Sequence, residues 1–199
     1  MATQPEPRYT EEEYLALERA SETKSEYLDG VIYARGGASA RHVQIVGNTT
    51  GELRNHLRDK PCVVYSTDLR VRVNRKGLYA YPDVVVVCEE PVFIDDELDT
   101  LTNPLLIVEV LSDSTKNYDR GEKFERYRSN SSFQEYLLIA QDRVHVERFV
   151  RRDDGTRVLH ETNSLDDTIE LASVGCHLPV SEIYLKVRFE TKLPSRSGG

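Results

Sequence analysis

The sequence predicts an α/β fold of the α+β type, in which a mixed β-sheet is flanked by helices. Two apolar runs rich in β-branched residues, Val84–Cys88 and Leu105–Leu111, are typical of strands buried on both faces of a sheet. Segments with apolar residues at helical spacing precede these runs and follow them. Helices and strands thus alternate along the chain in the order expected for helices packed on a sheet.

The length and composition suit one such domain. The chain has 199 residues, of which 39% are hydrophobic and 30% charged, enough for a normal core and too few residues for two comfortable domains. We expect a single domain over residues 9–190. The polar ends, residues 1–8 and 191–199, are expected to be disordered tails.

The first third of the chain contains a helix, a hairpin and a second helix. Thr10 and Glu13 form a capping-box pattern, which predicts a helix that ends near Arg19. Glu26 to Ala34 reads as a hairpin, because Asp29-Gly30 is a typical two-residue turn. A second, amphipathic helix is predicted from the helical spacing of its apolar residues, and it covers His42 to Arg58 with Val43, Val46, Leu53 and Leu57 on the buried side.

The rest of the chain is mainly strands. A charged helix is predicted over Asn117–Asn130, and smaller strands are expected after Gly155. The other predicted strands are Cys62–Tyr65, Leu69–Val73, Glu135–Ala140 and Val144–Val150.

The composition also limits the cellular context. No apolar run approaches the roughly 18 residues of a membrane span, and residues 1–8 lack the apolar core of a secretory signal. Cys62, Cys88 and Cys176 lie far apart without a CxxC pair, which predicts neither a zinc knuckle nor a disulfide. We therefore expect a cytoplasmic protein in a reducing compartment, with no membrane partner.

The net charge of −8 counts against strong non-specific binding to nucleic acid, which depends on Lys and Arg. A site that holds a divalent metal is itself acidic, however, and basic residues can still gather on one face. The charge alone therefore does not exclude an enzyme that acts on nucleic acid.

Two acidic residues stand at unusual places. Glu109 lies inside an apolar strand, where an unpaired charge would cost several kcal/mol, so it requires a basic partner, a proton or a metal ion. Asp83 follows Pro82 and opens the next apolar strand. If these strands are neighbours, the two carboxylates converge, and a hard cation such as Mg²⁺ fits between them. Alternatively, Glu109 faces solvent from an edge strand and Asp83 is a strand-entry residue.

The predicted helix carries a third candidate. Asp119, Lys123 and Tyr127 follow each other at intervals of four, which places them on one helix face. Lys123 could point into the carboxylate pair and neutralise charge on an attacked phosphate. The alternative is an ordinary ion pair with a packed tyrosine.

These motifs together resemble a known family. The chain is similar to the Uma-two family, whose members are described as putative restriction endonucleases of the PD-(D/E)XK superfamily. The similarity covers roughly Tyr9 to Leu185, and its motifs in chain order are Glu26-Tyr27-Leu28-Asp29-Gly30, His42, Asp68-Leu69-Arg70-Val71, Tyr81-Pro82-Asp83, Ile107-Val108-Glu109-Val110-Leu111-Ser112, Asp119-x-x-x-Lys123-x-x-x-Tyr127 and Glu135-Tyr136.

The resemblance implies a restriction-endonuclease-like PD-(D/E)XK fold and a metal-dependent nuclease site. Asp83 and Glu109 match the two acids that bind Mg²⁺, with Mn²⁺ as a substitute, and the Val110 backbone carbonyl would be a third ligand. The usual lysine two residues after the glutamate is absent, because Leu111 stands there. Lys123 would be its displaced equivalent, with Asp119 and Tyr127 positioning it. The pattern also has Leu137 where the family often has an aromatic residue.

Further residues are possible members of this site. Glu26 could contribute a third carboxylate from the first strand, although it could equally be a solvated strand residue. His42 heads the second helix and could approach as a general base, although a capping or surface role is the favoured interpretation. Ser112 and Ser114 could line the site or form a turn. The densest basic stretch, with Arg70, Arg72, Arg75 and Lys76, could contact phosphate, although a solvated strand face is the simpler interpretation.

The sequence therefore favours a Mg²⁺-dependent endonuclease that hydrolyses DNA, acting as a homodimer because duplex cleavage needs two cuts. One alternative is a catalytically inactive nuclease-like module that binds nucleic acid or protein. The other is purely structural: Glu109 and Lys123 form a buried ion pair, and Asp83 caps a strand.

Overall fold

A computed structural model describes residues 7–73, 77–113 and 115–189 of the chain. The described part of the amino-terminal half contains two helices and seven short strands. In chain order these elements are α1 Glu11–Ala20, β1 Ser25–Leu28, β2 Val31–Ala34, α2 Ala40–His56, β3 Val63–Ser66, β4 Arg70–Val73, β5 Leu78–Ala80, β6 Val84–Val87 and β7 Thr100–Leu101.

The carboxy-terminal half contains the longest strands and a helical segment in three pieces. In chain order its elements are β8 Leu106–Leu111, α3 Lys116–Tyr118, the π-helix η2 Asp119–Lys123, α4 Phe124–Tyr127, β9 Glu135–Ala140, β10 Val146–Arg151, β11 Arg157–Thr162, β12 Thr168–Leu171, β13 Cys176–Pro179 and α5 Val180–Ile183. The fold is thus of the mixed α/β class that the sequence predicted.

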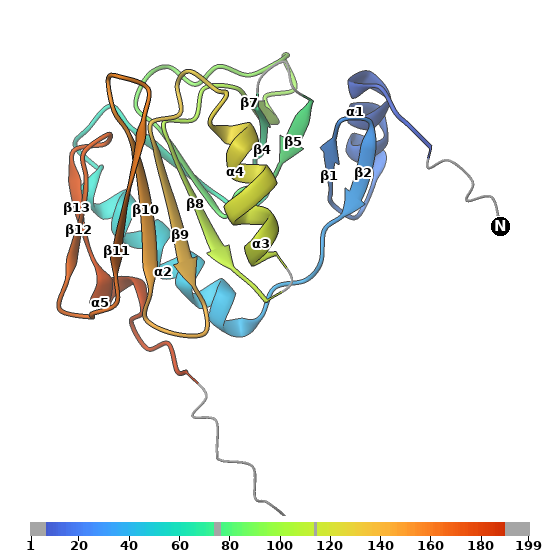
Figure 1. Cartoon of the computed structure of the whole chain (residues 1–199). Coiled ribbons are helices and arrows are strands. Elements are labelled where there is room, and N and C mark those ends of the chain that lie inside the picture. The colour runs from blue at the N-terminus through green and yellow to red at the C-terminus, as the bar shows by residue number, and fades with distance from the viewer. Residues whose placement is uncertain (1–6, 74–76, 114, 190–199) are drawn as a thin grey trace, which may run out of the picture.

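A six-stranded sheet with the order β11-β10-β9-β8-β6-β3 is the centre of the molecule (Figure 1). Strands β6 and β8 pair antiparallel, whereas β8 and β9 pair parallel, so the sheet is mixed. Every residue of β6, β8 and β9 is buried, which explains why these strands read as continuous apolar runs.

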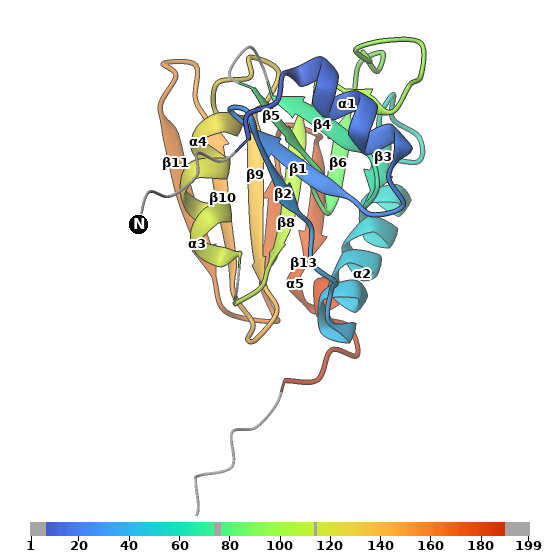
Figure 2. The ribbon, with the colours of Figure 1, turned by 90° about the vertical axis from the view of Figure 1, so that its right-hand side faces the viewer.

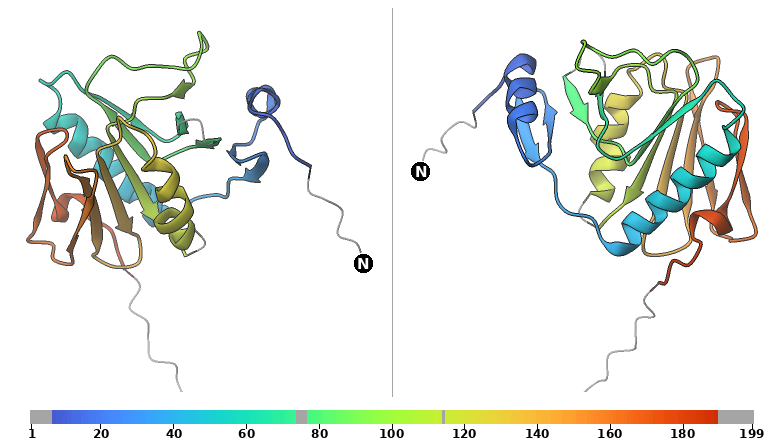
Figure 3. Two further views of the ribbon diagram at one scale, coloured as in Figure 1. Left: turned by 45° about the horizontal axis from the view of Figure 1, so that its top comes forward. Right: turned by 180° about the vertical axis from the view of Figure 1, so that it is seen from behind.

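The two faces of this sheet bury different elements. Alternate residues of β6 and β8, such as Val84 and Val108, join a core cluster with α2, α5, β12 and β13. The intervening residues, such as Val85 and Ile107, pack against α4 and against β4 and β5. Figures 2 and 3 show α2 along one side of the sheet, with α3 and α4 on the opposite side.

A second sheet with the order β2-β1-β5-β4-β7 lies on the α4 side, and it carries α1. Helix α1 begins at Thr10, whose side chain accepts a hydrogen bond from the Glu13 amide while Glu13 bonds back, as the capping-box pattern predicts. In the β1–β2 hairpin, Asp29 and Gly30 have φ angles of 48° and 96°, which suit a tight turn of this kind. Tyr14 of α1 stacks on Tyr27 of β1. These contacts fix the hairpin that presents Glu26.

Several sequence predictions need correction. The charged helix is not a regular α-helix from Asn117 to Asn130, because a π-helical turn interrupts it and α4 ends at Tyr127. Val43 of α2 is 60% exposed, and its neighbour Ile45 takes the buried position instead. The short strands β5 and β7 lacked a clear apolar pattern and were not anticipated, and β11 is a full six-residue strand rather than a minor one.

The basic stretch does not form the solvated strand face that the sequence predicted. Arg70 is buried, and it donates hydrogen bonds to Thr100, Tyr81 and Asp99. Its charge is therefore used inside the protein. Arg75, Lys76 and Ser114 lie outside the described residues, as do the predicted tails except for Pro7 and Arg8. Arg8 donates a hydrogen bond to the backbone of the β1–β2 turn.

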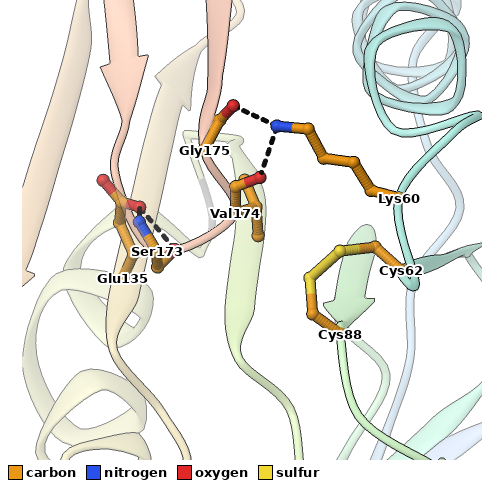
Figure 4. Close-up of a disulfide and its surroundings, with 7 residues drawn as sticks. All are labelled: Lys60, Cys62, Cys88, Glu135, Ser173, Val174 and Gly175. Atoms are coloured by element: carbon orange, nitrogen blue, oxygen red, sulfur yellow. Dashed lines mark hydrogen bonds between the residues drawn. A yellow bond between two sulfur atoms is a disulfide. The ribbon is translucent and has the colours of Figure 1, made fainter.

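The prediction of no disulfide was wrong, because Cys62 and Cys88 are bonded (Figure 4). The two residues are 26 positions apart in sequence, but β3 and β6 pair antiparallel with Val63 opposite Val87. The residues one step beyond this pair therefore lie side by side, which sequence spacing alone did not reveal. Cysteine usage consequently no longer supports the predicted reducing compartment. Among the described residues, no helix is long and apolar enough to cross a membrane.

Candidate active site

Asp83 and Glu109 lie on neighbouring strands and share one face of the six-stranded sheet. The β6–β8 register pairs Val84 with Val108, so Asp83, one residue earlier, stands opposite Glu109, one residue later. Residues opposite each other in an antiparallel pair project to the same side. That side is the one covered by α4, because it is also the side of Ile107 and Leu111. The first requirement of the predicted site is therefore met.

Both oxygens of the buried Asp83 carboxylate are engaged. Oδ2 accepts a hydrogen bond from the Val110 backbone amide at 2.7 Å. Oδ1 lies 3.0 Å from His42 Nε2 and 3.5 Å from Arg35 Nη2. Asp83 thus connects three segments that are distant in sequence: the loop after β2, the start of α2, and β8.

Glu109 and Lys123 form a buried ion pair. Lys123 Nζ lies 2.8 Å from Glu109 Oε1, and the two side chains are only 5% and 4% exposed. The same ammonium group is 3.2 Å from Glu26 Oε1 and 3.5 Å from Asp119 Oδ1. The Tyr127 hydroxyl donates to Glu109 at 3.1 Å. One lysine therefore serves three carboxylates at once.

The π-helical turn brings Lys123 to this position. Asp119 and Lys123 are its first and last residues, and both side chains are buried. Turns of this kind are rare in proteins and concentrate at functional sites. Glu26 is held from the other side, because its Oε1 accepts a hydrogen bond from the Tyr81 backbone amide at 3.2 Å. The β1–β2 hairpin thus closes the cluster opposite β8.

Burial dominates the electrostatics of the cluster. It raises the pKa of Glu109 to about 8, with Lys123 acting against this shift and Asp119, Asp83 and Glu26 adding to it. Burial also raises the pKa of Asp119. The surrounding carboxylates outweigh burial for Lys123, whose pKa lies well above its ordinary value. The site is therefore rich in carboxylate and short of positive charge.

The amino-acid sequence matches a known protein family over most of its length. The family model described as "Putative restriction endonuclease", Uma2, matches residues 11–181. The chain belongs to the Uma2 family. Two proteins of Synechocystis sp. (strain ATCC 27184 / PCC 6803 / Kazusa), "Uncharacterized protein slr1290" and "Uncharacterized protein sll1609", are each 37% identical to it; the alignments cover 93% and 82% of this chain and 96% and 92% of theirs.

A solved structure shares the fold. The crystal structure of a protein from Anabaena variabilis, described as a putative nuclease belonging to DUF820, superimposes with a TM-score of 0.73 and covers 88% of this chain and 97% of its own. The sequence identity is 17%, so this likeness concerns the fold alone. It supports the mixed α/β architecture that the Uma2 motifs imply.

The Uma2 motif residues assemble largely as the sequence predicted. Glu26, which could equally have been a surface residue, is inside the cluster, and His42 contacts Asp83. Tyr127 differs in its partner, because it donates to Glu109 instead of holding Lys123. The contact that the structure gives for Val110 is its amide bonded to Asp83, and a ligand role for its carbonyl stays a prediction.

Sequence reasoning missed Arg35, which contacts Asp83 and lies near the Tyr81 ring. No sequence motif marks Arg35, because it lies 48 positions before Asp83 and reaches that carboxylate only through its long side chain. Ser112 shares a hydrogen bond with Thr115, and its hydroxyl also accepts from the Thr115 amide. Ser112 therefore organises the turn before α3, which was one of its two expected roles.

The donor set of this Uma2 site fits Mg²⁺. The ion prefers carboxylate oxygens, and Glu26, Asp83, Glu109 and Asp119 are all buried here. Among the described residues, a second group of possible ligands lies elsewhere, where one imidazole and two carboxylates, those of His145, Glu147 and Glu161, have ligand atoms within 4.8 Å of one another. Glu147 is already held by Arg120, however, which makes that second group a hydrogen-bonded network.

Proposed function

We propose that this Uma2 protein is a Mg²⁺-dependent endonuclease that hydrolyses DNA phosphodiester bonds and has the PD-(D/E)XK fold, with Mn²⁺ able to replace Mg²⁺. One observation carries the proposal: two buried acids on adjacent strands share a sheet face, and a buried ammonium contacts one of them. Family membership adds support, since the Uma2 model is described as "Putative restriction endonuclease".

In this proposal, Asp83, Glu109 and the Val110 carbonyl hold Mg²⁺. When bound, the ion lowers the pKa of a water molecule and stabilises negative charge on the phosphate. Lys123 contributes a fixed positive charge next to Glu109, and its raised pKa supports this role over that of proton acceptor. Asp119 and Glu26 position the ammonium, while His42 and Arg35 orient Asp83.

Plasmid cleavage tests the proposal directly. Supercoiled DNA is incubated with the wild type, Asp83→Ala and Glu109→Ala, each with Mg²⁺, with Mn²⁺ and with a chelator. Asp142→Ala, which removes an exposed carboxylate at a sheet turn, is the matched control. Cleavage by the wild type and the control alone is expected, and it should disappear with the chelator. Equal cleavage by all four proteins would refute the assignment.

A structural role for the same residues is the second candidate, favoured by the close contact between Glu109 and Lys123. Glu109→Gln separates the two. A carboxylate placed to receive a metal is repelled in the metal-free protein, so Gln should be neutral or stabilising. A purely structural pair should lose stability with Gln, because Lys123 loses its charged partner. Calorimetry adds a second measurement, since a structural or inactive module should bind no Mg²⁺ or Mn²⁺ at millimolar concentration.

The expected assembly is a homodimer. Two strands of a duplex must be cut, and a twofold pair presents two sites in opposite orientation. Light scattering in the presence and absence of duplex measures the mass directly. A monomer under both conditions would remove this part of the proposal.

A further inference from the structure

Three arginines gather at one end of the sheet face that carries the candidate active site. Arg151 ends β10 and Arg157 begins β11, and the strand register places them directly opposite each other. Arg128 follows α4, and its guanidinium lies 5.4 Å from the centre of the Phe124 ring, which the guanidinium of Arg157 approaches to 5.8 Å. Like charges in directly opposed strand positions repel each other and destabilise a sheet. This arrangement therefore needs an explanation beyond folding.

The three side chains are held by neutral groups. Arg157 donates to the backbone carbonyls of Phe133 and Gln134 at 2.9 Å and 3.3 Å, and its guanidinium lies 4.7 Å from the Phe133 ring centre. Arg151 donates to the Ser131 carbonyl. Arg128 lies over the Phe124 ring. Across the described ranges, no carboxylate forms an ion pair with Arg128, Arg151 or Arg157.

The charges consequently remain uncompensated. Burial together with the nearby Arg151 and Arg128 lowers the pKa of Arg157 to about 10. At neutral pH all three groups still carry a positive charge. The chain has an overall charge of −8, so a cluster of three positive groups without acidic partners is a local exception. Arg128 is exposed, and Arg151 and Arg157 are half-buried, so solvent and ligands can reach them.

The cluster lies within reach of a substrate bound at the candidate site. Strand pairing places Glu109, Leu138 and Glu147 in one row across β8, β9 and β10. Arg151 is four residues along β10 from Glu147, so its side chain faces the same way, about 13 Å further along the strand. The two strand spacings between β8 and β10 add about 10 Å sideways, so the straight-line distance from Glu109 to Arg151 is about 16 Å. One DNA strand covers this distance in about five nucleotides.

We propose that Arg128, Arg151 and Arg157 form a docking site for the phosphate backbone of nucleic acid, which holds duplex DNA at the end of α4, on the same side of the six-stranded sheet as Asp83 and Glu109. This inference deepens the proposed function, on which it rests for the identity of the substrate. Guanidinium groups bind phosphate oxygens through paired N–H donors, and the neutral carbonyls and rings around them hold the groups without cancelling their charge.

Binding of duplex DNA in chelator tests the docking site separately from cleavage. Fluorescence anisotropy with a labelled 20-base-pair duplex is recorded over a range of salt concentrations for the wild type and for the double variant Arg128→Gln, Arg151→Gln. Each phosphate contact contributes about 0.9 to the slope of log affinity against log salt. The double variant should bind more weakly, with a slope shallower by about 2.

Two controls make this result specific. Arg54→Gln with Arg58→Gln removes the same charge from two exposed positions, one in the last turn of α2 and one just after it, on the opposite side of the sheet, and should leave the slope unchanged. Arg128→Lys with Arg151→Lys keeps the charge and should retain most of the slope. Melting temperatures confirm that each protein is folded.

The outcomes separate the two proposals. A wild type that does not bind the duplex, or a double Gln variant whose slope equals that of the wild type or of the α2 control, overturns the docking site. Arginine-dependent binding by a wild type that fails to cleave with Mg²⁺ upholds the docking site and refutes the nuclease function.

Discussion

Replacing Lys123 by Met is the sharpest test of how the buried cluster is balanced. Methionine has nearly the length of lysine and fills the same space, but it removes the ammonium group that contacts Glu109, Glu26 and Asp119. The variant therefore leaves several buried carboxylates without their cation while the packing stays almost unchanged.

The expected loss of stability is large. Removing one partner of a buried ion pair costs about 3–5 kcal/mol, because the remaining carboxylates are desolvated and either stay unpaired or must take up a proton. The side chains here are 5% and 4% exposed, so solvent screens little of this cost. For a domain of this size, each kcal/mol shifts the melting temperature by about 2–4 °C. Lys123→Met should therefore melt about 6–20 °C below the wild type at pH 7.

The assay is thermal unfolding in chelator and again with millimolar Mg²⁺. A cation that binds the carboxylates should restore part of the loss, since any ligand of the folded state stabilises it. Lys116→Met is the control, because Lys116 is only half-buried in the same helical segment and pairs with a side chain that is 90% exposed; it should change stability by less than about 0.5 kcal/mol. A Lys123→Met protein that melts within 2 °C of the wild type would refute the reasoning.

Three further predictions concern stability. Reduction of the Cys62–Cys88 disulfide, which closes a loop across 26 positions, should lower the free energy of unfolding by about 3 kcal/mol. Thermal melting with and without reductant measures this difference, and a Cys62→Ser protein should show none. Hydrogen bonds, above all from Arg19, hold the pKa of Asp99 below its ordinary value. Ionised Asp99 therefore stabilises the fold at any pH above the ordinary pKa of an aspartate, and this contribution is lost as the pH falls through the acidic range. Asp99→Asn should thus lower the free energy of unfolding by about 1 kcal/mol at pH 7, a figure discounted for partial exposure. The difference in stability between the variant and the wild type should shrink towards pH 2, and a difference that stays constant with pH would contradict the assignment. Thr10→Ala should cost about 1 kcal/mol by removing the helix cap, as measured in urea, whereas an unchanged midpoint would mean that α1 does not depend on it.

The sequence anticipated those features that follow from local pattern. The capping box of α1, the Asp29-Gly30 turn and the buried strands β6 and β8 are where their residues indicated. Asp83 and Glu109 could be paired in advance because an apolar strand does not tolerate a lone carboxylate without reason. Family motifs then supplied the order in which the elements assemble.

What the sequence did not reveal depends on contacts between distant segments. The disulfide follows from the β3–β6 register, which no cysteine spacing encodes. Arg70 looked like a surface residue, and only the packing of α1 and β7 around it explains its burial. Arg35 reaches Asp83 from a loop without any motif. In each case, register and side-chain length decide the outcome rather than local propensity.

The π-helical turn has a consequence for how this chain tolerates insertions and deletions. In an uninterrupted α-helix, Tyr118 and Tyr127 would point in opposite directions, because nine residues advance the helix by about 900°. The additional residue in the wider turn delays the rotation by about 100°, which allows both tyrosines to pack against the same core. Removing a single residue inside the turn, such as the uncrowded Gly121, would restore regular winding and leave Tyr118 and Tyr127 in phase, because eight residues of α-helix also advance by about 800°. The wider turn can therefore lose one residue while the helical pieces on either side of it keep their packing.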